Sequence, residues 1–324
     1  MSESVQTMVD RWARASGKTQ EFSATLDLLR LLAAELYHEY EPFPDKPPFL
    51  VRLATWLENV PEDVDRQALF EFVPWLLFIG SKEMKSMYRA AFAGPITQWI
   101  IDDAELDITS PRLTEEFTAA VEKTLFGGIA GMDVGRFVRL TCPSGQEHRP
   151  DFRDLAAFGG IQGLNTYLQT NGYERIVAVD DYVGTGSQMS RPATSLAQLV
   201  DYRILLCPIV VAAKGAETGR KIAAKHPGHV YFSPLWVVPT RSSITETASS
   251  ETATPNEFDD LRELIIRTWP QVRGSSPESS LRNPFGFGAT GSLVLTYLNC
   301  PNNVPPFVHH LSDKWNPLFQ RKSR

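Results

Sequence analysis

The sequence predicts an α/β fold, a parallel sheet flanked by helices, with an added helical region at the N-terminus. Between residues 176 and 238, apolar strand patterns alternate with helical patterns, which is typical of a parallel sheet with right-handed crossovers. A leucine stripe at helical spacing occupies residues 21–40, and glycine-rich, β-prone stretches begin near residue 125. We therefore expect a helical region over residues 1–124 and an α/β domain with a C-terminal extension over residues 125–324.

Length and composition set the class of protein. The chain has 324 residues, 43% of them apolar, which is enough for a sizeable core in one or two domains. A formal net charge of -6 argues against general binding of duplex DNA. The three cysteines are scattered without metal-ligand spacing, and the N-terminal residues lack the apolar core of a signal peptide. We expect reduced thiols in a cytoplasmic protein that does not enter a membrane.

The N-terminal region reads as a series of helices separated by prolines. Helices are expected at residues 5–15, 21–40, 49–59, from 61 onwards, and 81–92. The Gly94-Pro95 pair should break or kink the last of them. The apolar run at residues 72–80 suits either a partner-binding surface or the core of this region, and we favour the core.

The second part of the chain carries the strand patterns. Strands are expected at residues 125–131, 176–179, 202–213, 230–238 and 293–298. Helices are expected from residue 136 and at 158–171, 188–199, 216–226 and 257–269. Residues 241–256 are rich in Ser, Thr and Glu and read as a surface loop.

The chemistry concentrates in one stretch. The apolar residues 176–179 predict a buried strand that ends at Asp180 and Asp181, and a Gly-Thr-Gly-Ser turn at 184–187 leads into a helix. Ligands of open α/β sheets bind beyond the carboxyl ends of the strands, and such a turn presents backbone N–H groups to an anion. This arrangement suits a phosphorylated sugar. A metal pocket of a receiver-like domain and an ordinary polar strand end are the alternatives.

The ungapped stretch from Val177 to Ser187 resembles the phosphoribosyl-diphosphate (PRPP) signature of type I phosphoribosyltransferases. The resemblance implies that Asp180 and Asp181 hold the ribose 2′- and 3′-hydroxyls and a Mg²⁺ ion. It also implies that the loop holds the 5′-phosphate through Gly184, Thr185, Gly186, Ser187 and Gln188. Purine-salvage members often carry an aspartate that assists the base where this chain has Gly184, so ordinary purine salvage is not expected.

The same resemblance implies sites for the diphosphate. The glycine-rich segment 131–135 occupies the slot of a diphosphate-binding loop, and the polar segment 142–153 occupies that of a basic hood loop. Candidate diphosphate ligands are Asp133, Gly135, Arg136 or Arg139, His148, Arg149, Arg153 and Lys214. Guanidinium forks suit a diphosphate because they are planar and permanently charged. Arginines on a solvated helix face, an ordinary surface loop and a lysine that caps a strand are the plainer interpretations.

The C-terminal part extends the resemblance. The motifs Phe-Gly-Phe-Gly at 285–288, Pro-Asn-Asn at 301–303 and Trp-Asn-Pro-Leu-Phe at 315–319 are similar to phosphoribosyltransferase-like proteins of bacterial conflict systems. That subgroup implies a role in anti-phage defence and a partner effector protein. His309 and His310 fit no metal-ligand spacing and are expected to be exposed.

Three functions remain open from the sequence. The first is a Mg²⁺-dependent pentosyltransferase that uses PRPP. The second is a module that senses PRPP or a related nucleotide without turnover and regulates a partner effector. The third is a hydrolase of nucleotide N-glycosidic bonds. The sequence does not identify the molecule that would accept the pentosyl group. Both a monomer and a homodimer are compatible with it.

Overall fold

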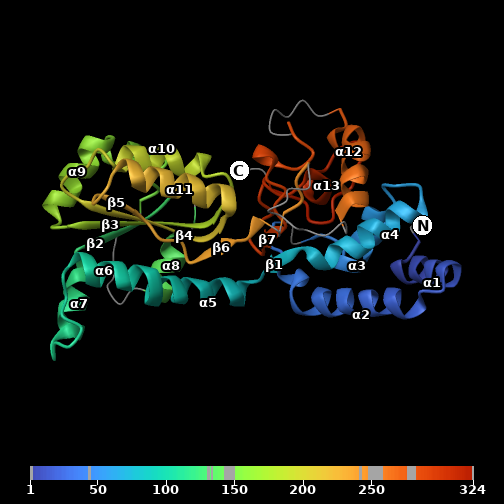
Figure 1. Ribbon diagram of the computed structural model, residues 1–324, viewed down its shortest axis with the longest axis horizontal. Coiled ribbons are helices and arrows are strands. Elements are labelled where there is room, and N and C mark those ends of the chain that lie inside the picture. The colour runs from blue at the N-terminus through green and yellow to red at the C-terminus, as the bar shows by residue number, and fades with distance from the viewer. Residues whose placement is uncertain are drawn as a thin grey trace. The chain divides into compact units, whose positions relative to one another are not determined.

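The computed structural model describes residues 3–42, 45–129, 132, 134–141, 150–240, 243–246, 258–275 and 282–322. The chain forms two compact units (Figure 1). The first unit combines Met1–Ser81 with Thr240–Arg324, and the second is Lys82–Pro239. This division differs from the predicted boundary between residues 124 and 125. The C-terminal segment from Thr240 onwards therefore belongs to the same unit as the N-terminal helices.

The second unit contains the parallel sheet that the sequence predicts. Its strands are β2 (Thr124–Gly128), β3 (Arg175–Val183), β4 (Arg203–Ala212), β5 (Val230–Phe232) and β6 (Trp236–Val238). They follow the order β2-β3-β4-β5, with β6 beside the later part of β4, and every pairing is parallel. The single strand predicted at 230–238 is therefore two short strands. Pro234 lies between them and has no N–H for the ladder.

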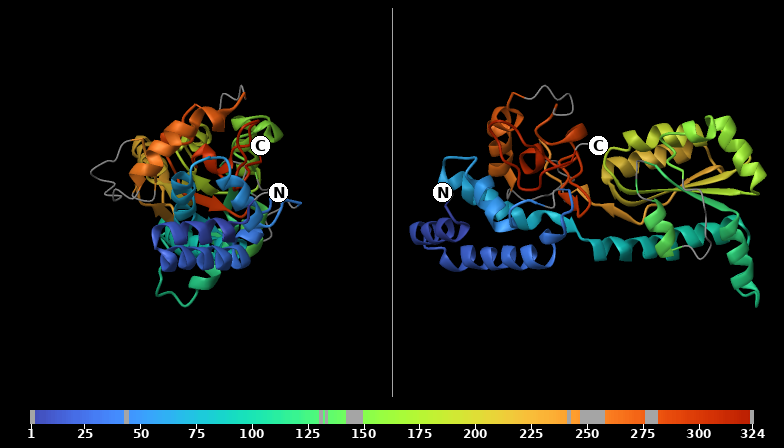
Figure 2. Two further views of the ribbon diagram at one scale, coloured as in Figure 1. Left: turned by 90° about the vertical axis from the view of Figure 1, so that its right-hand side faces the viewer. Right: turned by 180° about the vertical axis from the view of Figure 1, so that it is seen from behind.

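Helices cover both faces of this sheet (Figures 1 and 2). On one face lie α9 (Ile161–Thr170), α10 (Ser187–Leu196) and α11 (Ala213–Lys225). On the other lie α5 (Ser81–Ala91), α6 (Thr97–Asp103) and α8 (Val134–Thr141), and α7 (Leu113–Glu122) leads into β2. The predicted kink at Gly94-Pro95 takes the form of a π-helical turn over Phe92–Ile96. The expected α/β class is confirmed.

Two interactions fix the sheet between its helices. The first is a buried core made by β2, β3 and β4 with α9, α10 and α11, in which Leu125, Leu164, Ile176 and Leu206 are fully buried. The second is an ion pair between Arg175 at the start of β3 and Asp103 at the end of α6. Its N–O distance is 2.7 Å, and the two side chains are 8% and 11% exposed. Such an enclosed pair fixes α6 against the amino end of β3.

The first unit is mainly helical. Its elements are α1 (Val5–Ser16), α2 (Thr19–Glu35), α3 (Phe49–Leu57), α4 (Asp63–Phe72), β1 (Leu77–Ile79), α12 (Asp259–Arg273), β7 (Val294–Thr296) and α13 (Pro306–His309). β1 and β7 pair in parallel as a separate two-stranded sheet. The run predicted to be core contains β1 and is only partly buried, because Trp75 is 51% exposed.

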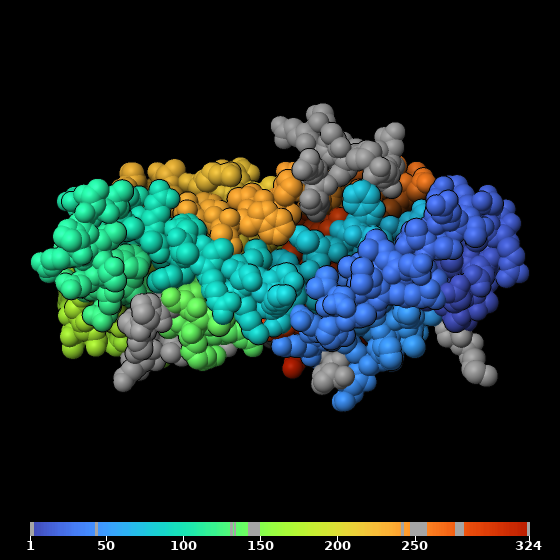
Figure 3. Space-filling model, turned by 90° about the horizontal axis from the view of Figure 1, so that it is seen from below, coloured from blue at the N-terminus to red at the C-terminus, as the bar shows by residue number. Residues whose placement is uncertain are grey.

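Helices α1 and α2 form a surface of this unit, which Figure 3 shows in blue. Leu28 and Leu31 of α2 are 42% and 57% exposed there, although Leu26 and Leu29 of the same helix are buried. The leucine stripe of the sequence therefore covers more of the helix than its buried face. Among the described residues, no helix is both long and apolar enough to cross a membrane.

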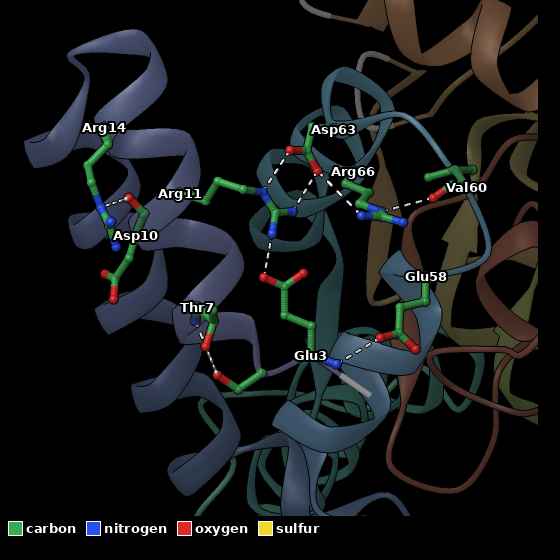
Figure 4. A network of polar contacts seen from close by, with 10 residues as sticks. Glu3, Thr7, Asp10, Arg11, Arg14, Glu58, Val60, Asp63 and Arg66 are labelled. Carbon is green, nitrogen blue, oxygen red and sulfur yellow. Dashed lines mark hydrogen bonds and ion pairs between the residues drawn. The ribbon is translucent and has the colours of Figure 1, made fainter. Parts of the chain in front are cut away.

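Charged residues join α1 to α4 (Figure 4). The Arg11 guanidinium donates Nε and Nη2 to Asp63, at 2.9 and 2.8 Å, and also contacts the Glu3 carboxylate. Arg66 approaches Asp63 at 3.4 Å and donates Nε to the Val60 carbonyl. The hydrogen bonds from Arg11 lower the pKa of Asp63 to about 2.

The C-terminal motifs contribute buried residues to the first unit, Phe285, Asn303, Trp315, Leu318 and Phe319, although Phe287 is 41% exposed. The indole N–H groups of Trp56 and Trp315 both donate to the Phe307 carbonyl, at 2.7 and 2.8 Å. His309, predicted to be exposed, is only 5% exposed, and one of its ring nitrogens lies 3.0 Å from the Val304 carbonyl. Burial lowers the pKa of His309 to about 3. The prediction was wrong because the tail folds over the N-terminal helices and encloses α13.

Candidate functional site

The acid pair lies inside β3, near its carboxyl end. The apolar pattern predicts a strand that ends at the acid pair, but β3 continues to Val183 because β4 runs beside it and pairs Val183 with Val211. Asp180 is 5% exposed, and Asp181 is half-buried. The carboxylates are therefore held by a paired strand and not by a mobile turn.

The glycine-rich turn connects β3 to α10. Gly186 has φ of 81°, a left-handed conformation that favours glycine, and it directly precedes the first helical residue, Ser187. Ser187 and Gln188 are exposed, whereas Gly184 and Gly186 are buried. The hydroxyls of Thr185 and Ser187 lie 3.0 Å apart. The first turn of α10 thus opens to solvent with two hydroxyls, and its orphan N–H groups and dipole favour an anion there.

Helix α11 packs against this turn through two close approaches. A Cβ added at Gly215 would lie 2.7 Å from the Gly184 carbonyl oxygen and 2.9 Å from that of Val183. A Cβ at Gly186 would lie 2.6 Å from Cβ of Thr218, whose hydroxyl donates to the Thr185 carbonyl at 2.9 Å. The turn therefore packs closely on α11, backbone against backbone at Gly215 and backbone against the Thr218 side chain at Gly186, so glycine is needed on both sides of the contact.

Tyr88 of α5 contacts Asp181 of the acid pair, a contact that the sequence pattern does not predict. Its hydroxyl donates a hydrogen bond to Oδ1 of Asp181, and the side chain is 1% exposed. Its ring meets the edge of Phe137 in α8, with 5.6 Å between the centroids. A buried tyrosine needs a partner for its hydroxyl, but its place on the helix does not reveal which one. Tyr88 restricts the rotation of the Asp181 carboxylate.

An arginine lies near the acids from the side of β2. Gly128 at the end of β2 exchanges backbone hydrogen bonds with Pro150 and Phe152, both at 2.8 Å. The next residue, Arg153, forms a forked ion pair with Asp151, with Nη2 at 2.6 Å from Oδ2. The hydrogen bonds to Asp151 raise the pKa of Arg153, and the charge of Asp180 contributes in the same direction. Arg153 is therefore within electrostatic range of Asp180.

The other diphosphate candidates are spread around this edge. Lys214 is exposed in the first turn of α11, directly after the carboxyl end of β4. Helix α8 begins at Val134, so Gly135 and Arg136 fall in its first turn, with Gly135 buried and Arg136 half-buried. Asp133, His148 and Arg149 lie outside the described residues. The described candidates from β3, β4 and α10 thus come to one edge of the sheet.

The described residues do not form a ready-made metal site at this end of the sheet. Within the described ranges, no three His, Cys, Asp or Glu side chains are grouped so as to hold a metal ion. Two neighbouring carboxylates can still bind Mg²⁺ when the substrate supplies further oxygens, which is the usual arrangement for this ion.

Comparison with known proteins gives one match. The family model PRTase-CE matches residues 53–321 of the chain, which include the acid pair, the glycine-rich turn and the C-terminal motifs. No curated protein and no solved structure matches the chain.

Proposed function

Because the chain belongs to the PRTase-CE family of phosphoribosyltransferase-like proteins, we propose that its second unit binds PRPP or a related phosphoribosyl ligand with Mg²⁺. The observation that carries the proposal is the exposed first turn of α10 directly after the acid pair of β3. A phosphate at this turn and carboxylates on the preceding strand match the two ends of a ribose 5-phosphate.

Each part of the site has a role in binding. The 5′-phosphate accepts hydrogen bonds from the backbone of residues 184–188 and from the hydroxyls of Thr185 and Ser187. The ribose hydroxyls donate to Asp180 and Asp181. Tyr88 keeps one oxygen of Asp181 in place, which lowers the entropy that the carboxylate loses when ligand binds.

The diphosphate is the most highly charged part of the ligand. Arg153, Arg136 and Lys214 are the described cations that we assign to it, and Asp133, Gly135, His148 and Arg149 complete the proposed set. When bound, Mg²⁺ would neutralise charge on the diphosphate, with Asp180 or Asp181 as protein ligands. The Arg153 guanidinium can exchange its partner Asp151 for the diphosphate, because both side chains are exposed and an exposed ion pair contributes little to stability.

Transfer would break the bond between C1′ and the diphosphate oxygen, with the electron pair leaving on the diphosphate. The ribose carbon then gains cationic character, which the carboxylates of Asp180 and Asp181 stabilise. A nucleophile of the acceptor forms the new bond to C1′ and loses its proton. No side chain of the chain needs to act as a nucleophile.

One observation favours a sensor as the second candidate. Gly184 has no side chain that could assist a base, and its carbonyl faces Gly215 so closely that α11 fills the space beneath it. A site that binds PRPP without an acceptor would regulate a partner through the bound state. Incubation with PRPP, Mg²⁺ and a panel of bases separates the two. Release of diphosphate indicates the enzyme, and tight binding without release indicates the sensor.

The primary test is the melting temperature with PRPP and Mg²⁺. We expect stabilisation of the wild type, loss of that stabilisation in a variant with Asp180→Asn and Asp181→Asn, and its retention in Asp201→Asn. Asp201 is an exposed carboxylate just before β4, at the amino ends of the strands and so away from the candidate site. It serves as the matched control. A wild-type melting curve that excess PRPP leaves unchanged would refute the proposal.

The family membership also motivates a biological proposal, a role in anti-phage defence together with a partner effector. Cells that express the wild type with its gene neighbours should resist infection, and the double acid variant should not. Equal resistance with both proteins would argue that the acid pair has no part in defence. If nucleotide pools fall during infection in an Asp180- and Asp181-dependent way, N-glycosidic hydrolysis replaces transfer as the activity.

A further inference from the structure

The first unit contains a group of cations around Tyr40 that plays no part in the proposed function. Lys46, Arg52 and Arg321, called the basic cluster below, come from two segments far apart in the sequence. Tyr40 itself is 2% exposed, and its hydroxyl donates to the Gln320 carbonyl at 2.7 Å. This hydrogen bond brings the C-terminal segment with Arg321 to the segment that carries the other two cations.

Two of the three cations, Lys46 and Arg52, lie over aromatic rings. Lys46 Nζ is 4.3 Å from the centroid of the Tyr40 ring and donates to the Tyr40 carbonyl. The Arg52 guanidinium is 5.6 Å from the Phe49 centroid and 5.4 Å from that of Phe319, and its Nη1 donates to the Leu318 carbonyl at 2.6 Å. The charge of Arg321 acts on the Tyr40 hydroxyl, as does that of Arg52. The rings beneath are buried and apolar, so they fix the positions of the charges without neutralising them.

The basic cluster has no carboxylate partner in the described part of the chain. None of the ion pairs among the described residues involves Lys46, Arg52 or Arg321. The Nε–H group of Arg52 is enclosed without an acceptor. Burial lowers the pKa of Arg52 to about 10, and burial together with the charge of Arg52 lowers the pKa of Lys46 to about 8.

These observations mean that the fold holds like charges together with carbonyl and aromatic contacts, but with no carboxylate among the described residues to neutralise them. An anion would neutralise them. A fork-shaped guanidinium beside a compact ammonium is the pair of groups that tetrahedral phosphoryl oxygens use best, since the first gives directed hydrogen bonds and the second a point charge. We propose that the basic cluster is a second anion site that binds a phosphoryl group, separate from the turn at residues 184–188.

Lysine labelling can locate such binding on the full chain. At pH 8, an amine with a pKa of about 8 is neutral in about half of the molecules, so an acylating reagent should label Lys46 faster than the exposed Lys314. An anion favours the protonated amine, and a rise of one unit in the pKa would slow labelling about fivefold. Peptide-resolved mass spectrometry measures both lysines in one sample.

Inorganic phosphate is the first probe, with chloride at matched ionic strength as its control. We expect phosphate to slow labelling of Lys46 and not that of Lys314, and Arg52→Gln to reduce this protection. Stronger protection by adenosine monophosphate would identify a nucleotide as the source of the phosphoryl group, and equal protection would identify free phosphate. Protection of Lys46 by neither compound, or equally at Lys314, overturns the proposal.

The turn at 184–188 also attracts phosphate under the proposed function, so the two sites must be separated. Gly186→Ala strains that turn, because φ is 81° and the new Cβ would meet Thr218. If the basic cluster is an independent site, phosphate still protects Lys46 in this variant, whatever happens to stabilisation by PRPP. Loss of the protection in Gly186→Ala would show that the effect originates at the turn and would refute a separate site.

Discussion

Replacement of Gly215 by alanine tests how the phosphate turn is held. Gly215 lies in the first turn of α11, and an added Cβ would be 2.7 Å from the Gly184 carbonyl oxygen, 2.9 Å from that of Val183 and 2.9 Å from Cγ2 of Val211. The nearest contact is about 0.7 Å shorter than the 3.4 Å at which ordinary contact begins. Two of the three atoms are backbone oxygens, so the turn and α11 have to separate.

The effect on ligand binding follows from that displacement. A shift of about 1 Å in positioned groups can cost about a hundredfold, so a shift of about half that size should weaken PRPP binding roughly tenfold. The stability change should be small, because overpacking costs about 1–3 kcal/mol while alanine is favoured over glycine in a helix by about 1 kcal/mol. Binding and folding should therefore respond differently to the same methyl group.

Gly94→Ala is the matched control. Gly94 is also helical and in the second unit, but a Cβ there would meet nothing within 4 Å. Calorimetric titration with PRPP and Mg²⁺ should give a weaker dissociation constant for Gly215→Ala and an unchanged one for Gly94→Ala. Amide exchange over residues 183–188 gives a readout without ligand and should be faster in Gly215→Ala alone. Equal exchange and equal affinity in both variants would refute the packing argument.

Three further outcomes are expected. Tyr88→Phe removes the hydroxyl that donates to Asp181 but keeps the ring, so we expect PRPP affinity to fall severalfold with a stability loss of about 1–2 kcal/mol by denaturant titration; unchanged affinity would show that Asp181 needs no positioning. The pKa of Asp63 is about 2 in the folded protein, against the ordinary value of 3.8 that applies in the unfolded chain. The stability that the Asp63 carboxylate contributes to the fold is therefore present above about pH 4 and is lost as the pH falls towards 2. Asp63→Asn should flatten this acid limb by about 1 kcal/mol or less, since the carboxylate is partly exposed, and a parallel limb would contradict the assignment. Burial raises the pKa of the Cys207 thiol to about 12, and Cys300 is also buried, so a Cys142→Ser variant should show no thiol that reacts rapidly with a disulfide reagent until it is denatured.

The sequence carried most of the candidate site because its signals are local. Strand periodicity, two acids and a glycine turn before a helix occupy one continuous stretch, 176–188, and a parallel strand order follows from the alternation of elements. The start of α10 and the location of Lys214 after β4 could therefore be predicted. The extension of β3 through the acids could not, because it depends on pairing with β4.

Only the tertiary structure decided which distant segments meet. The Tyr88 hydroxyl reaches Asp181 across 93 positions of the chain, and Trp56 and Trp315 share one carbonyl although they come from opposite ends of it. The same packing encloses His309, assigns the C-terminal motifs to the first unit and gathers the basic cluster. Local patterns record how a segment alternates between apolar and polar residues, but they do not record its partner. The partner is set by the shape and hydrogen-bonding needs of surfaces that exist only once the chain has folded.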